Sequence, residues 1–175
     1  MSRFAPDMAV LRFLGPLNAA IARCCMIIAV AGLLAIVAVV ALQVFGRYVL
    51  NDTPTWAESL ALVLVLYVTM FGAAVGVRDA GHIGLESLVG LLLPAPWRRW
   101  VEGLIHLLVA AFGATMAWHA GLLAESVMGY KIPTLGLPEG INHVSLSLAG
   151  ALIVLFSIEH ILALMAGEKV RPSWH

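Results

Sequence analysis

The stretch VFGRYVLNDTPTWAESLALVLVLYVTMFGAAVGVRDAGHI, residues 44–83, decides the fold of this chain. Within it, an uncharged run from Ser59 to Val77 lies between Glu58 and Arg78. These nineteen residues, at a helical rise of about 1.5 Å each, cover roughly 30 Å, the thickness of the hydrocarbon core of a bilayer. The run therefore predicts a transmembrane helix over residues 59–77.

Three further uncharged runs have a similar length and the same kind of charged border. The residues that border them are Arg23 and Arg47, Glu102 and Glu125, and Glu139 and Glu159. We expect the last helix to continue a little beyond Glu159. The predicted spans are therefore residues 24–46, 59–77, 103–124 and 141–164.

The composition agrees with a membrane protein. Of the 175 residues, 62% are hydrophobic and 11% are charged, and the mean hydropathy is +0.98, outside the usual balance of soluble domains. Short connections leave no room for a separate soluble domain, so residues 1–175 are predicted to form a single all-α, four-helix membrane domain. The sequence contains no Walker A motif, nucleophile elbow or metal-ligand spacing, so we expect no enzymatic activity, no metal site and no binding of nucleic acid.

The positions of Lys and Arg predict the orientation, because positively charged loops are retained in the cytoplasm. Eight of the ten lie on the side that carries both termini: Arg3, Arg12, Arg23, Arg78, Arg98, Arg99, Lys169 and Arg171. Arg47 and Lys131 lie on the other side. Both termini are therefore expected in the cytoplasm.

The segment HIGLESLVGLLL, residues 82–93, is too short to cross a bilayer and is followed by Pro94 and Pro96. Wound as a helix, it places leucines on a broad arc opposite Glu86, Ser87 and Gly90. This pattern favours a short amphipathic helix at the cytoplasmic interface. An apolar loop packed on the other helices without regular structure is the alternative.

Gly72 and Gly76 belong to the sequence GAAVG and lie one turn apart on the same face of the second span. Such small residues allow a neighbouring helix to approach closely. The neighbour could be a helix of a partner subunit or another helix of this chain, and the sequence alone favours neither.

Four histidines, His106, His119, His143 and His160, lie in or at the ends of the third and fourth spans. A b-type haem needs two axial imidazoles from facing helices. Antiparallel packing of these spans would allow His106 to pair with His160 and His119 with His143. A haem-binding membrane anchor of a respiratory oxidoreductase is therefore the alternative function.

Glu159 is expected within one or two turns of the cytoplasmic surface. A carboxylate at that depth either extends its side chain to the interface or pairs with a neighbouring group. A proton relay would need several such residues, and no other span carries an acid in its middle.

Two stretches carry a resemblance to a known family. The first begins with Arg47-Tyr48-Val49-Leu50-Asn51 and continues through Pro54, Trp56, Glu58, Phe71-Gly72-Ala73-Ala74, Arg78 and His82-Ile83. The second is IPTLGLPEGI, residues 132–141, which leads into the last span. Together they resemble the small membrane subunit of TRAP (tripartite ATP-independent periplasmic) transporters, the DctQ-like family. Ser59 and Glu86 depart from the pattern, since the family often has a second acid at the first position and an aspartate at the second.

The resemblance implies a non-catalytic subunit of the bacterial inner membrane. Its expected partners are a large TRAP membrane subunit, a periplasmic substrate-binding protein and the lipid bilayer. It implies uptake of an organic anion of the dicarboxylate or sialic acid type, driven by an ion gradient, usually of sodium. No cofactor is expected, because the transport sites of this family lie in the large subunit. The candidate partner-contact residues are Arg47, Trp56, Glu58, Gly72, Gly76, Arg78 and His82.

Overall fold

The computed structural model describes residues 5–79, 95–167, 170 and 173. Within these residues, four helices are long and apolar enough to cross a membrane: α1 (Ala5–Phe45), α2 (Thr55–Asp79), α4 (Ala95–Val127) and α5 (Gly140–Ala166). The described part of the chain contains no β-strand, so the all-α prediction is confirmed. The interfacial helix predicted over residues 82–93 lies outside the described residues.

Helix α1 is longer than the span predicted within it. It contains 41 residues, which at about 1.5 Å per residue correspond to roughly 60 Å, about twice the hydrocarbon thickness. Its first part, before Arg23, is rich in Ala and Leu, which are strong helix formers. The helix therefore begins at Ala5 and extends well before the charged border of the first span.

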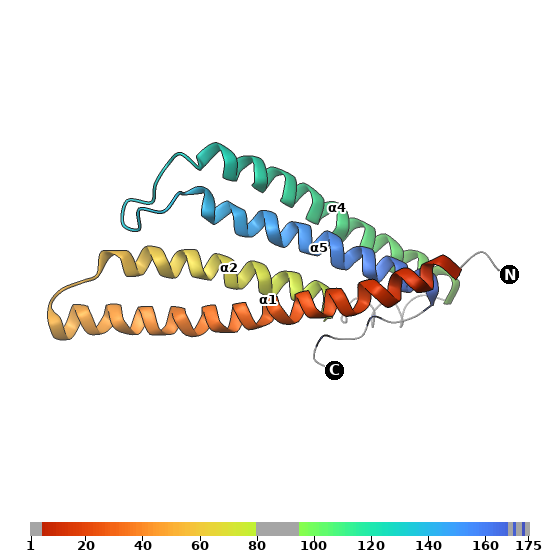
Figure 1. Ribbon diagram of the computed structural model, residues 1–175, viewed down its shortest axis with the longest axis horizontal. Helices are drawn as coiled ribbons and strands as arrows, with labels where there is room; N and C mark the ends of the chain where they lie inside the picture. Colours follow the sequence, from red (N-terminus) through yellow and green to blue (C-terminus); the bar gives the residue numbers. More distant parts are fainter. Residues whose placement is uncertain (1–4, 80–94, 168–169, 171–172, 174–175) are drawn as a thin grey trace.

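The helices lie side by side in the spatial order α1, α2, α5, α4, and α1 also touches α5 (Figure 1). Among the described helices, α4 packs only against α5. Helix α1 begins and α5 ends at one end of the molecule, which we call the terminal end. The opposite end, where α1 leads to α2 and α4 leads to α5, is called the loop end.

The buried core lies where α1, α2 and α5 meet. It is built from Ala22, Cys25, Ala74, Val75, Ile153 and Phe156. Most of these side chains are small, so the helix backbones approach one another closely, as is usual in membrane bundles. Most large apolar side chains of α1 and α4 point outward, as expected for surfaces that face lipid or a partner subunit.

Candidate functional site: a buried charge cluster and two open surfaces

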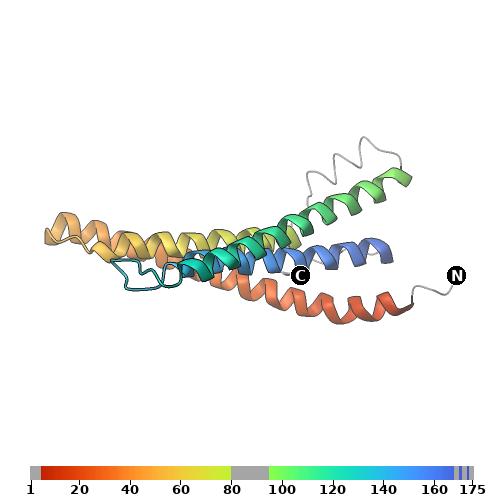
Figure 2. The ribbon, with the colours of Figure 1, turned by 90° about the horizontal axis from the view of Figure 1, so that it is seen from above.

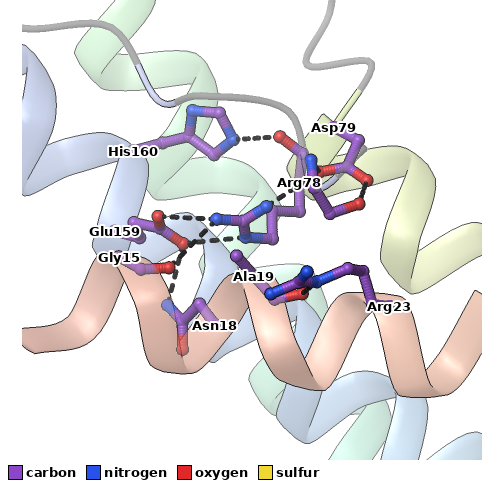
Figure 3. Close-up of polar contacts among 9 residues, drawn as sticks. Gly15, Asn18, Ala19, Arg23, Arg78, Asp79, Glu159 and His160 are labelled. Carbon is purple, nitrogen blue, oxygen red and sulfur yellow. Dashed lines mark hydrogen bonds and ion pairs between the residues drawn. The ribbon is translucent and has the colours of Figure 1, made fainter. Parts of the chain in front are cut away.

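A pair of opposite charges joins α2 to α5 near the terminal end (Figure 3). Arg78 Nε and Nη2 each lie 3.1 Å from one of the two carboxylate oxygens of Glu159, so the pair is bidentate. Each residue has only 3% of its surface exposed. A charge removed from water is tolerated only when it is paired and hydrogen-bonded, and this geometry meets both conditions. The ion pair therefore holds the last turn of α2 against α5.

Helix α1 completes the coordination of this pair. The Asn18 side-chain amide donates to Glu159 Oε2 at 2.8 Å, and Arg78 Nη2 donates to the Gly15 carbonyl at 3.3 Å. The guanidinium carbon also lies 6.0 Å from the centroid of the Phe156 ring, within the range of a cation–π contact. Three helices thus converge on one buried arginine. We call Asn18, Arg78, Asp79 and Glu159 the charge cluster.

Asp79 extends the charge cluster toward the C-terminal residues. Its Oδ1 lies 2.9 Å from Arg78 Nη1 and accepts the Ser173 backbone N–H at 3.0 Å. The Ser173 hydroxyl donates to the other carboxylate oxygen. Ser173 is itself buried. The last turn of α2 therefore holds both the α5 carboxylate and a residue that follows α5.

His106 and His160 lie beside the charge cluster, and their geometry decides against the haem alternative. Their rings are stacked almost parallel, at 7°, with centroids 4.7 Å apart. His160 Nε2 lies 3.0 Å from the Arg78 carbonyl oxygen, which can only accept a hydrogen bond, so this nitrogen is the donor (Figure 3). Axial ligation requires a nitrogen of each ring to point at an iron between them. Rings in direct face-to-face contact leave no space for a porphyrin.

The second pair proposed for haem ligation is His119 with His143. His119 is exposed on α4 and His143 is half-buried at the start of α5. Neither side chain is buried within the bundle. For Glu159, the sequence predicted either a side chain that extends to the interface or a pair with a neighbouring group. In the structure the carboxylate pairs with Arg78.

Helices α4 and α5 cross with their backbones in contact. A Cβ atom placed on Gly150 would lie 2.6 Å from Gly113 O and 2.6 Å from Ala117 N. The Ser147 hydroxyl donates to the Ala117 carbonyl at 2.9 Å in the same region. Small residues here are a requirement of the fold, because any larger side chain would meet main-chain atoms. Sequence analysis missed this crossing, although Gly113, Ala117 and Gly121 recur every four residues.

The loop end carries three of the candidate partner-contact residues. Arg47 and Glu58 are exposed, and Trp56 is 40% exposed. Arg47 belongs to a single π-helical turn, Gly46–Leu50, which ends at Asn51 in a left-handed conformation with φ 54°. Asparagine tolerates this conformation better than most residues. The Arg47-Tyr48-Val49-Leu50-Asn51 motif is therefore a compact turn that reverses the chain into α2.

The two stretches that carry the family resemblance meet at the loop end. Thr134, in the loop between α4 and α5, donates to the Ser59 hydroxyl at 2.6 Å. The Tyr67 hydroxyl donates to the Ile141 carbonyl at 3.0 Å, which joins α2 to the start of α5. Ser59, one of the two departures from the family pattern, takes part in this contact.

Gly72 and Gly76 lie on a face of α2 that no other described element covers. A Cβ atom on either glycine would have no neighbour within 4 Å among the described residues. The two glycines therefore do not serve helix packing inside this part of the subunit, which was one of the two interpretations left open. Leu62, Val65 and Thr69 continue the same exposed face toward the loop end.

The structure thus separates the candidate residues into three places rather than one site. Arg47, Trp56 and Glu58 lie at the loop end, Gly72 and Gly76 on the open face of α2, and Arg78 inside the charge cluster. His82 lies outside the described residues. Asn18 and Asp79 were not among the predicted site residues. A single asparagine in an apolar stretch was the available signal for Asn18.

Comparison with known proteins finds relatives among transporter subunits. The family profile described as "Tripartite ATP-independent periplasmic transporters, DctQ component" matches residues 36–167. The Vibrio cholerae protein named sialic acid TRAP transporter small permease protein SiaQ is 26% identical over 139 residues, which are 79% of this chain and 80% of SiaQ.

Two further relatives match shorter parts. The C4-dicarboxylate TRAP transporter small permease protein DctQ of Rhodobacter capsulatus is 29% identical over 96 residues, 49% of this chain and 42% of that protein. The sialic acid TRAP transporter permease protein SiaT of Haemophilus influenzae is 33% identical over 76 residues, 43% of this chain but only 12% of SiaT. The family match covers most of the described helices, so the chain belongs to the DctQ family of small membrane subunits of TRAP transporters.

Proposed function

We propose that this chain is a non-catalytic scaffold for a large transport subunit in the bacterial inner membrane. The observation that carries this proposal is the charge cluster, in which the buried charges of α2 and α5 are directed at one another rather than into a cavity. Such an arrangement suits a rigid support. A transport site would instead present polar groups to a substrate.

The proposed partners are the large TRAP membrane subunit and a periplasmic substrate-binding protein. The match to a small fraction of SiaT supports the first, since a segment similar to this chain occurs there within a much longer permease. The relatives are named for sialic acid and for C4-dicarboxylates, which are both organic anions. We therefore propose uptake of a carboxylate-bearing anion, driven by an ion gradient, with sodium as the expected coupling ion.

We propose the open face of α2 around Gly72 and Gly76 as a contact with the large subunit. Lipid already solvates apolar groups, so helices in a membrane associate through close packing, and exposed glycines permit it. Arg47, Trp56 and Glu58 are proposed as further contacts at the loop end. For Arg78 the contacts within the subunit suggest an indirect role, which holds the end of α2 in place.

The orientation is proposed with both termini in the cytoplasm, because the sequence assigns eight of the ten Lys and Arg residues to the side of the membrane that carries both termini. Reporter fusions near Arg98 and after Arg171 are expected to score as cytoplasmic, and a fusion near Lys131 as periplasmic. A periplasmic score for the fusion after Arg171 would contradict this orientation.

Uptake by proteoliposomes tests the proposed function and the α2 contact together. The chain alone is expected to transport no organic anion, whereas the chain with its large subunit and binding protein should show gradient-dependent uptake. Gly72→Leu should reduce recovery of the large subunit and slow uptake. Overpacking of a contact typically costs ~1–3 kcal/mol, which weakens binding by roughly one to two orders of magnitude.

Ala38→Leu is the control, because Ala38 is exposed on α1 and receives the same leucine side chain. Since a Cβ on Gly72 meets open space, Gly72→Leu should leave the fold of the subunit intact. Saturable uptake by the isolated chain would overturn the scaffold role. Unchanged recovery and uptake with Gly72→Leu would instead remove only the α2 face from the proposed contact.

A further inference from the structure

A groove of about 690 Å³ lies between α4 and α5 at the terminal end. Figure 2 shows the two helices diverging toward this end, whereas they lie close together toward the loop end. The walls of the groove are apolar and consist of Gly103, Leu104, Leu107, Ile161, Leu164 and Met165. An apolar groove on a membrane helix pair must be filled by an apolar group, because no water is available there.

The mouth of the groove carries a fixed positive charge. Arg99 is exposed, and its Nη2 donates to the Leu164 carbonyl at 3.0 Å. Leu164 lies in the last turn of α5, which ends at Gly167 in a left-handed conformation with φ 77°. A cation is favourable at this helix end. Only one of the five N–H donors of Arg99 is used in this contact, so the guanidinium can still bind an anion.

The side chains beside Arg99 suit the boundary between headgroups and hydrocarbon. Trp100 lines the groove and is 80% exposed, and tryptophan prefers this boundary. Arg98, on the other side, pairs with Glu102 at 2.7 Å. From Arg99 to Leu107 the groove follows α4 for about 12 Å, the scale of one leaflet of the hydrocarbon core.

We propose that this groove binds one glycerophospholipid of the leaflet at the terminal end. Its phosphate contacts the Arg99 guanidinium, which matches phosphate oxygens in geometry and charge. One acyl chain lies along Gly103, Leu104 and Leu107 and fills the space between the diverging helices. The lipid thereby completes the α4–α5 pair where protein side chains do not.

Native mass spectrometry of the delipidated full-length chain, titrated with phosphatidylglycerol, tests this site. The wild-type chain should retain one lipid at low lipid concentration. Arg99→Gln should weaken retention by about tenfold, the loss expected for one charge-assisted hydrogen bond. Arg99→Lys should retain part of the binding, since it keeps the charge but loses the planar fork.

Two variants separate the groove from general charge effects. Gly103→Phe should abolish retention by filling the groove, and its Cβ would begin in ordinary contact, 3.5 Å from Leu164 Cδ2. Arg12→Gln removes an exposed positive charge from α1 and should leave retention unchanged. Equal retention by all variants, or equal loss with Arg12→Gln, would overturn the site. Displacement of the lipid by the bound large subunit would also overturn it and identify the groove as a subunit contact.

Discussion

Replacing Arg78 with methionine is expected to destabilise the subunit by about 3–5 kcal/mol, the typical cost of removing one partner from a buried ion pair. The change leaves the carboxylates of Glu159 and Asp79 buried at the terminal end without their shared cation. It also removes the donor to the Gly15 carbonyl, so α1, α2 and α5 lose the polar contact that they share through Arg78. The measurement is size-exclusion chromatography after heating, in which Arg78→Met should lose its monodisperse peak at a lower temperature than the wild type.

The charge cluster also predicts a ranking of variants. Glu159→Gln should be milder than Arg78→Met, because Asp79 remains 2.9 Å from the guanidinium and still neutralises it. The double variant Arg78→Met/Glu159→Met should recover part of the loss, since buried pairs are often replaced by apolar residues at little cost. A variant at exposed Arg12 serves as the control. If Arg78→Met melts at the wild-type temperature, the charge cluster does not lock the helices.

The four membrane helices could be predicted because their signal is local. An uncharged run bordered by charged residues can be recognised within about twenty residues. Its length matches the thickness of the bilayer core, which identifies it as a membrane span. The same reasoning failed to foresee how far α1 extends. Its first part is a good helix former, but Arg23 separates it from the uncharged run, so a search for uncharged runs leaves it out.

The charge cluster could not be predicted from spacing. Helical periodicity relates residues three or four apart, whereas Arg78 and Glu159 are separated by 81 positions and meet only when α2 packs on α5. Taken alone, each of the two charged residues only marks the end of an uncharged run. Asn18 is a weaker signal still, since one amide near a membrane surface is unremarkable until a carboxylate is found 2.8 Å away.

The glycines show why a motif in one helix is an incomplete guide to packing. The GAAVG sequence of α2 drew attention to Gly72 and Gly76, and both face open space in the described part of the chain. The close backbone approach occurs between Gly113 of α4 and Gly150 of α5 instead. A repeat of small residues marks α4, but a close approach also needs the second helix, and the sequence does not say which helix that is.

Gly150→Leu is expected to separate α4 from α5 and to destabilise the subunit by ~3 kcal/mol or more, at or beyond the upper end of ordinary overpacking. A Cβ at this position would lie 2.6 Å from Gly113 O, 2.6 Å from Ala117 N and 3.0 Å from Ala117 Cα. All three are main-chain atoms, so no rotation of a side chain can relieve the clash. The helices must move apart, and the bond from Ser147 to the Ala117 carbonyl breaks with them.

The arrangement of the helices makes this effect larger than a single clash. Among the described helices α4 packs only against α5, so no other described helix holds it once the crossing opens. Gly72→Leu is the matched control, because the same substitution there meets open space and should melt close to the wild type. Even Gly150→Ala should lower the melting temperature measurably, since its Cβ already clashes. Equal melting temperatures for Gly150→Leu and Gly72→Leu would mean that α4 does not cross α5 at this glycine.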